Sequence, residues 1–392
     1  MDALAKLREQ NAEISAWRRH LHAHPETAFE EFKTSDYVAA LLESWGVEHH
    51  RGLAKTGIVA TIRGKGNTSG RVIGLRADMD ALNIFEENDV AYKSTTPGKM
   101  HACGHDGHTA MLLAAVRHLA ATRDFDGTVH AIFQPAEEGG GGGNVMVQEG
   151  FFDKFPCDSV YGMHNWPWAP AGTMQMCAGA VSASTDTFVM TVTGRGGHAA
   201  FPHNAVDVIA TGAAIVTALQ TIVSRNVDPL DSAVVSICKF HAGTDSLNVL
   251  PSTMTLGGTA RTLRPETRKK VEDRIRAVVA GIADAHGATV DIDWRKGYPS
   301  VVNTAAETEQ CRDVAVALVG AENVSEFTPM MGGEDFAYFL EQRPGSYVIL
   351  GGGKTGNDPG LHHPRFDFND DVLPVGAAYW VKLAETLLPL QK

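Results

Sequence analysis

Hydrophobic residues recur at two different spacings in the first 180 residues. Val38, Leu41, Leu42 and Trp45 follow the i, i+3, i+4, i+7 spacing of one helix face, which predicts an amphipathic helix over about residues 30–45. A second helix is expected over about Thr109–Ala121. Short apolar runs predict buried strands at Gly57–Arg63, Arg71–Arg76, Gly127–Phe133 and Asp158–Met163. Strands that alternate with helices favour an α/β domain around a largely buried sheet.

The middle of the chain follows a different order of elements. Phe188, Met190 and Val192 alternate with polar neighbours, as in a strand with one buried face. The elements expected after this strand are a helix over about Ala205–Val223, strands at about Ser232–Phe240 and Ser252–Thr262, a helix from Pro265 that stops at Gly287, and a strand at Thr289–Trp294. The order β-α-β-β-α-β is the ferredoxin-like plan.

The last hundred residues return to the alternating pattern. We expect a helix near residues 305–319, a strand at Ser346–Leu350 and a terminal helix from about Pro374. This segment is too short for a core of its own, and inserts are tolerated where chain ends lie close together. The sequence therefore predicts a two-domain α/β protein. Residues 1–180 and 296–392 form the catalytic, metal-binding domain, and residues 181–295 form an inserted α+β domain.

Composition narrows the class of protein. The chain has 392 residues with Lys+Arg 34 and Asp+Glu 46, a net charge of −12, so it lacks the basic surface that nucleic acid or an anionic membrane requires. Five widely spaced cysteines without a CxxC pair are typical of reduced thiols. The N-terminus lacks the apolar core of a signal peptide, and no apolar run is long enough to cross a membrane, so we expect a cytoplasmic protein.

The densest polar cluster runs from His101 to His108 and holds a cysteine and three histidines. Thiolate and imidazole are donors that first-row divalent metals prefer. Cys103 and His105 can converge on one metal if the backbone is irregular, and Gly104 and Gly107 are expected to supply that freedom. The alternative is an ordinary loop with a buried thiol and solvated imidazoles.

Further candidates follow other predicted strands. Glu137 and Glu138 come after a buried strand, where one carboxylate can bind an ion while the other carries a proton. His164 and His362 are each, taken alone, more often structural than ligating. Together with Cys103 and His105 they fall mostly at strand ends in one α/β domain, where ligands gather in open sheets.

Additional polar residues can orient ligands or bind substrate. Asp78 and Asp80 end a strand and can ligate a metal or orient an imidazole. In the insert, His198 on a glycine turn, Asn248, and Arg261 at a strand end can face an anionic substrate. Each of these three is equally compatible with an ordinary surface residue.

Several motifs combine into a specific signature that extends almost end to end. They are Trp17 through His22, His24 through Glu26, Arg76 through Leu82, His101 through His108, Ala136 through Gly139, Gly194 through His198, Gly332 through Phe336 and Leu361 through Pro364. In this order they resemble the M20 metallopeptidases, and specifically the amidohydrolase branch of hippurate hydrolases, N-acyl-amino-acid deacylases and auxin-conjugate hydrolases.

The resemblance implies a centre of two divalent metal ions, whose identity (Zn, Mn, Co or Ni) it does not select. The implied ligands are Cys103, His105, Glu138, His164 and His362. Glu137 would be the general base that takes a proton from the activated water, and Asp80 would orient one of the ligands. The insert is expected to serve as a lid and dimerisation domain. His198 would then stabilise the oxyanion in a neighbouring subunit of a homodimer or homotetramer, and Asn248 and Arg261 would hold the carboxylate of an N-acyl amino acid.

Three alternatives remain open at this point. A carboxypeptidase or dipeptidase would use the same two-metal site with different pockets. A thiol hydrolase would use Cys103 as nucleophile and would survive chelation but not alkylation. A non-catalytic metal-binding protein would be expected to lack Glu137.

Overall fold

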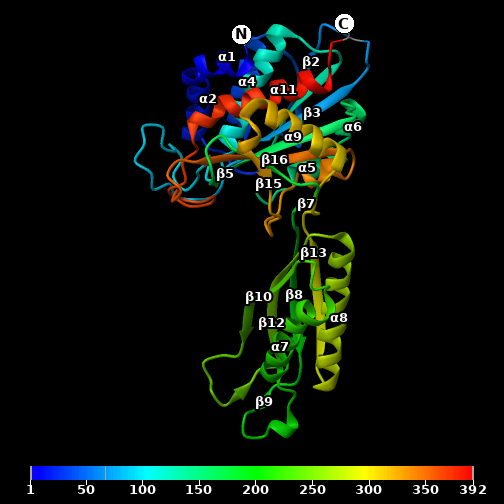
Figure 1. Cartoon of the computed structure of the whole chain (residues 1–392). Helices are drawn as coiled ribbons and strands as arrows, with labels where there is room; N and C mark the ends of the chain where they lie inside the picture. The colour runs from blue at the N-terminus through cyan, green and yellow to red at the C-terminus, as the bar shows by residue number, and fades with distance from the viewer. Residues whose placement is uncertain (1, 67, 391–392) are drawn as a thin grey trace. The chain divides into compact units, whose positions relative to one another are not determined.

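The computed structural model describes residues 2–66 and 68–390, and the chain divides into two compact units (Figure 1). The first unit comprises Met1–Gly179, Val302–Thr328 and Asp335–Lys392, and the second comprises Ala180–Val301 and Pro329–Glu334. The sequence-based boundaries placed residue 180 and residues 296–301 and 329–334 in the catalytic domain, whereas the structure groups them with the second unit. The short strands β7 (Gly179–Ser182) and β14 (Val301–Asn303) lie where the chain passes between units.

In the described part of the first unit, eight strands form a sheet in the spatial order β1-β2-β4-β3-β5-β16-β6-β15. Strands β4, β3, β5 and β16 are neighbours and run parallel, so their carboxyl ends lie at one edge of the sheet. The bounds are β1 Glu48–Leu53, β2 Gly57–Arg63, β3 Val72–Asp78, β4 Thr128–Gln134, β5 Ser159–Pro170, β6 Met174–Met176, β15 Val324–Glu326 and β16 Gly345–Gly353.

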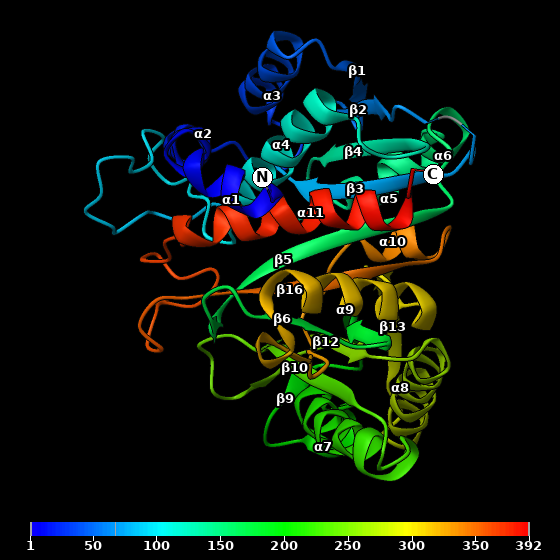
Figure 2. The ribbon, with the colours of Figure 1, turned by 45° about the horizontal axis from the view of Figure 1, so that its top comes forward.

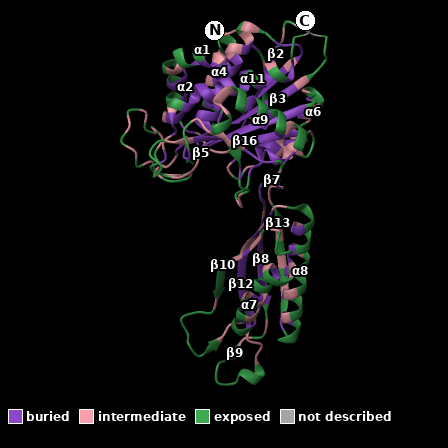
Figure 3. Ribbon diagram, in the orientation of Figure 1, coloured by how far each residue is buried: buried purple, intermediate pink, exposed green. Residues whose placement is uncertain are grey.

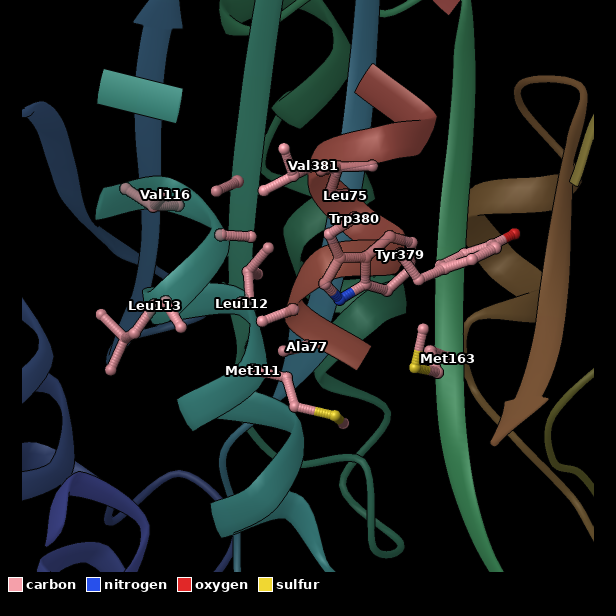
Figure 4. Close-up of a cluster of buried hydrophobic side chains, with 14 of the residues drawn as sticks. Leu75, Ala77, Met111, Leu112, Leu113, Val116, Met163, Tyr379, Trp380 and Val381 are labelled. Carbon is pink, nitrogen blue, oxygen red and sulfur yellow. The ribbon is translucent and has the colours of Figure 1, made fainter. Parts of the chain in front are cut away.

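Helices α4 and α11 pack together beside the sheet (Figure 2). Leu75 and Ala77 of β3 lie with Met111 and Leu112 of α4 and Trp380 of α11 in a cluster of buried hydrophobic side chains (Figure 4). Burying each large apolar side chain stabilises the fold by about 1.5–3 kcal/mol. The helices of this unit are α1 Ala3–Glu9, α2 Asn11–Ala23, α3 Phe32–Ser44, α4 His105–Thr122, α5 Gly142–Gln148, α6 Phe151–Lys154, α9 Ala305–Val319, α10 Ala337–Leu340 and α11 Leu373–Leu387.

Two predicted elements differ from the observed ones at positions that matter for the site. Helix α4 begins at His105, four residues earlier than expected, because the polar start of the helix carries no apolar periodicity. Strand β5 continues from Ser159 to Pro170, so His164 lies inside the strand and not at its end. The predicted strand Gly57–Arg63 is confirmed as β2.

The second unit is a four-stranded antiparallel sheet in the order β10-β12-β8-β13, packed against two helices. Met190 and Leu256 of the sheet are buried with Ile215 and Ile275 of the helices, while Figure 3 shows much of α8 exposed. The elements follow the predicted β-α-β-β-α-β order as β8 Ser184–Thr193, α7 Val208–Asn226, β10 Ala233–Ala242, β12 Thr253–Thr262, α8 Pro265–Ala285 and β13 Thr289–Lys296.

One described helix, α7, is long and apolar enough to cross a membrane by length and composition. Its residues Ile215, Leu219 and Ile222 are buried in the core of the second unit. Asp207 caps its N-terminus by accepting hydrogen bonds from the backbone of Ile209 and Ala210. One face of α7 therefore packs on the core of the second unit.

Candidate active site

The candidate ligands gather at the carboxyl edge of the parallel strands. Asp78 ends β3, Glu137 and Glu138 follow β4, and His164 lies in β5. Because these strands are adjacent and parallel, residues far apart in the sequence converge there.

Two overlapping groups of side chains can each hold a metal ion. The ligand atoms of Cys103, His105 and His164 all lie within 4.8 Å of one another, as do those of Cys103, Glu138 and His362. The structure thus brings all five predicted ligands together, with Cys103 common to both groups. His105, Glu137 and Glu138 form a further group of this kind.

The chemistry of the donors fits divalent metal ions. The two groups present one sulfur, three imidazole nitrogens and one carboxylate, a set that suits borderline first-row ions. His105 Nε2 is buried and has no hydrogen-bond partner among the described residues. A buried ring nitrogen without a partner is costly unless something binds it, so this atom supports a ligand at the site.

Gly104 shapes the turn between Cys103 and His105. Its φ of +98° is a left-handed conformation, and a Cβ there would lie 2.3 Å from Asn165 Oδ1. The expectation that Gly107 also supplies an irregular backbone was wrong, because Gly107 lies within helix α4. Gly107 instead leaves space for a ring, since a Cβ there would lie 2.3 Å from Phe368.

Two non-glycine residues at the site adopt left-handed backbone conformations. Ala136, directly before Glu137, has φ +56°, and the ligand candidate His362 has φ +64°. Such conformations cost about 1–3 kcal/mol each and persist only where the surroundings hold them. His362 donates its backbone N–H to Ala102 O at 2.8 Å, and its Nε2 lies 3.0 Å from Glu138 Oε1.

Hydrogen bonds orient the two buried imidazoles. His164 Nδ1–H donates to the carbonyl of Asn165 at 2.7 Å, which leaves Nε2 3.3 Å from Cys103 Sγ. His105 Nδ1 lies 3.1 Å from Asp80 Oδ1, and its Nε2, 3.7 Å from Asp78 Oδ2, is the ring atom left to bind a metal ion. The second oxygen of Asp80 accepts the backbone N–H of Glu138 at 2.8 Å, so one carboxylate holds two ligand candidates.

The electrostatics of Cys103 disfavour a free thiolate. Burial raises the pKa of the Cys103 thiol well above its usual range, and the nearby carboxylates of Glu138 and Glu137 raise it further. Burial, with His108 beside it, lowers the pKa of His164 well below its usual range, so His164 is neutral. A nucleophilic cysteine needs a lowered thiol pKa, so the raised pKa of Cys103 counts against the thiol-hydrolase alternative.

Asp78, one of the candidates for orienting an imidazole, forms a buried pair with His108 next to the ligands. His108 Nδ1 lies 2.6 Å from Asp78 Oδ1, and His108 Nε2 lies 2.7 Å from Asn165 Oδ1 and 3.0 Å from Asn165 N. Burial alone would raise the pKa of Asp78, but Arg76, His105 and His108 outweigh it and hold that pKa well below its usual range. His108 lies one helical turn after His105, and this spacing was the available sequence signal.

Glu137 is held in place by Asp335, which lies 198 residues later in the chain. The backbone N–H of Asp335 donates to Glu137 Oε1 at 3.4 Å. The Asp335 carboxylate accepts from Arg76 at 2.9 Å and from Gln134 at 2.8 Å. Arg76 and Asp335 appeared in the sequence motifs, but no local pattern indicated that they meet across 259 residues.

The predicted substrate residues belong to the second unit. His198 (β9, Gly197–His198) pairs with Val249 (β11, Val249–Leu250), and Ala199 N donates to Asn248 O at 2.9 Å. His198 and Asn248 line an open cavity of about 710 Å³ within that unit. Arg261 is not among the lining residues, because its guanidinium bonds Asp186 O, Thr259 Oγ1 and Ala260 O.

Comparison with known proteins places this chain among the metal-dependent hydrolases. Residues 74–386 match the model of the peptidase family M20/M25/M40. A hippurate hydrolase of Campylobacter jejuni is 40% identical over 386 residues, covering 98% of this chain and 99% of the relative. An N-acetyl-L-cysteine deacetylase of Bacillus subtilis is 39% identical, covering 95% and 87%.

A solved structure gives the same result for the fold. A Bacillus subtilis protein described as a dinuclear metal binding peptidase of the M20 family has a TM-score of 0.85 and 34% identity, with 96% of this chain and 98% of that chain covered. The chain belongs to the peptidase family M20/M25/M40. Within it the chain is a metal-dependent amidohydrolase, as the sequence motifs predicted, and its two ligand groups support a two-metal site.

Proposed function

We propose that this amidohydrolase cleaves the amide bond of N-acyl amino acids, including hippurate-like aroyl-amino acids. The observation that carries the proposal is the pair of ligand groups that share Cys103 and lie beside the Glu137 carboxylate. The names of the hippurate hydrolase and deacetylase relatives support this substrate class.

Cys103, His105, Glu138, His164 and His362 would hold two divalent ions, with Zn, Mn, Co or Ni as the candidates. When bound, such ions lower the pKa of a water and polarise the amide carbonyl. Asp80 keeps His105 and the backbone of Glu138 in the orientation that ligation requires.

Glu137 acts as the general base in this proposal. Its buried carboxylate takes a proton from the attacking water and later returns it to the leaving amine. The Asp335 N–H donates to Oε1 and fixes the orientation of this carboxylate. Because Glu138 is assigned to ligation, the adjacent carboxylates have separate roles.

The second unit supplies the remaining parts of the proposed site. We assign it as a ferredoxin-like lid and dimerisation domain of a cytoplasmic homodimer or homotetramer. His198 would enter a neighbouring subunit's site and stabilise the oxyanion, and its exposure in the isolated chain is compatible with such a role. Asn248 and Arg261 would bind the carboxylate of the amino-acid product. The cavity shared by His198 and Asn248 supports joint action of these two residues.

A carboxypeptidase or dipeptidase is the second candidate function, because the Bacillus subtilis neighbour is described as a peptidase and matches 98% of its own length. The same ligands and base would serve that reaction. Only the pockets for the acyl group and for the amino acid would differ.

A substrate panel separates the two functions. The purified enzyme is stripped with a chelator, reloaded with each metal in turn and assayed on hippurate, acetyl-amino acids and dipeptides. Faster hydrolysis of the acyl-amino acids supports the proposal, whereas faster dipeptide hydrolysis favours the peptidase. Full activity after chelation, together with loss on thiol alkylation, would overturn both in favour of a thiol enzyme.

A further inference from the structure

Glu31 is a fully buried carboxylate that the mechanism above does not use. It occupies the N-cap position of helix α3, in a segment 105 residues before Ala136. A carboxylate removed from water is costly unless donors surround it. Its partners therefore indicate why it is placed there.

Three donors converge on this one side chain. Oε1 of Glu31 accepts the backbone N–H of Phe29 at 3.0 Å and that of Ala136 at 2.9 Å. Oε2 accepts the hydroxyl of Thr56 at 2.7 Å. The Glu31 carboxylate thus links three segments by hydrogen bonds: its own loop, the residue before β2 and the loop after β4.

Two of these donors belong to residues with left-handed backbones. Phe29 has φ +61° and Ala136 has φ +56°, conformations that residues with a Cβ rarely adopt. Ala136 directly precedes Glu137, so its dihedral angles set the direction in which the Glu137 side chain leaves the backbone. The bond from Ala136 N to Glu31 holds this strained conformation in place.

The glycines that follow reinforce the same geometry. A Cβ on Gly142 would lie 1.8 Å from Pro135 O, so the chain passes closely over the residue before Ala136. Gly142 N also donates to Ala136 O at 3.0 Å. Both backbone groups of Ala136 are therefore engaged, one by Glu31 and one by the glycine turn.

We propose that Glu31 is a positioning residue that acts through Ala136 to hold Glu137 in its working orientation. This inference rests on the proposed role of Glu137 as general base. Glu31 itself does not exchange protons with the substrate.

The state of charge of Glu31 guides the choice of variants. Burial raises its pKa to about 7, although the hydrogen bonds from Thr56 and from the backbone lower it. A glutamine keeps an oxygen acceptor for the two amides and can donate to Thr56, so Glu31→Gln preserves the contacts without the charge. Glu31→Ala removes the acceptor for all three donors.

The experiment compares Glu31→Ala, Glu31→Gln and Glu137→Gln, all reloaded with the same metal. The matched control is Glu26→Ala, because Glu26 accepts from Thr34 N and Oγ1 at the start of the same helix but does not contact Ala136. We expect Glu31→Ala to lose about 10²-fold in kcat at nearly unchanged KM and metal content. Glu31→Gln and Glu26→Ala should keep most of their kcat.

A double variant separates positioning from folding. Ala136→Gly relieves the left-handed strain, so Glu31→Ala/Ala136→Gly should recover thermal stability, but its freer backbone should leave kcat low. Recovery of kcat together with Tm in the double variant would overturn the proposal, because Glu31 would then be purely structural. If Glu31→Ala keeps its full kcat while Glu137→Gln is inactive, only the role of Glu31 is overturned and the base assignment stands. Normal turnover by Glu137→Gln would overturn the base assignment and, with it, the role of Glu31.

Discussion

The carboxylate of Asp80 joins His105 to Glu138. One oxygen lies 3.1 Å from His105 Nδ1, and the other accepts the Glu138 backbone N–H at 2.8 Å. Asp80 is itself buried and follows the end of β3 by two residues. A rigid strand end therefore orients two ligand candidates that come from different segments of the chain.

Replacing Asp80 by alanine should weaken metal binding by about 10–100-fold, because groups that orient ligating histidines typically contribute that much. Metal affinity would be measured by competition with a chromophoric chelator. Asp124→Ala, which removes an exposed carboxylate paired with Lys65, is the control. Equal affinities in the two variants would contradict the role assigned to Asp80.

Glu137→Gln should retain bound metal and lose about 10²–10⁴-fold in rate, because glutamine fills the same space but cannot accept the proton. Metal content by mass spectrometry and kcat on hippurate are the two measurements. Near-normal turnover in the variant would exclude Glu137 as the base.

Cys103→Ala should reduce the bound metal, because Cys103 belongs to both candidate ligand groups. Its buried, neutral thiol is a poor nucleophile in the free protein, so alkylating agents should react with it slowly. The exposed Cys238 serves as the internal comparison for alkylation. An unchanged metal count in Cys103→Ala would rule out ligation by this residue.

The stability of the folded protein is expected to depend on pH through His22. It is buried between Asp106, at 2.9 Å, and Glu86, at 3.1 Å. Burial alone would lower its pKa, but these carboxylates raise it to about 9. Since the folded pKa lies above the unfolded value of about 6.5, the charged form stabilises the folded state fully below pH 6.5. This contribution is lost as the pH rises to about 9.

The expected loss over this pH range is at most on the order of 3 kcal/mol. Urea unfolding of the wild type and of His22→Asn at pH 6 and pH 9 measures it. The wild type should lose more stability than the variant between these two pH values. Parallel pH profiles would show that folding does not raise the pKa of His22.

The local parts of the site could be predicted because their chemistry is concentrated in short segments. Four potential ligands fall between His101 and His108, and two carboxylates follow the strand β4 directly. The alternation of strands and helices likewise predicted an α/β unit, since that pattern repeats over short windows. The family model and the relatives confirm the amidohydrolase resemblance that the combined motifs carried.

The supporting contacts could not be predicted, because each joins residues far apart in the sequence. Each also involves a backbone N–H group, which leaves no mark in the amino-acid sequence. Glu31 reaches Ala136 N, and Asp335 N reaches Glu137, across 105 and 198 residues. The start of α4 at His105 was missed for a related reason. Its first turn is buried by polar contacts, such as that of His108 with Asp78, and not by an apolar stripe.

The proposed action of His198 across subunits can be tested by mixing inactive variants. His198→Ala subunits keep an intact base, and Glu137→Gln subunits keep an intact histidine, so a mixed dimer contains one complete site if His198 acts in the neighbouring subunit. A well-placed oxyanion donor contributes about 3–4 kcal/mol, so each parent should be strongly impaired. The mixture should recover up to half of the wild-type activity per mixed dimer. Native mass spectrometry confirms that mixed dimers have formed, and a lack of recovery in them would place His198 in its own subunit's site or outside catalysis.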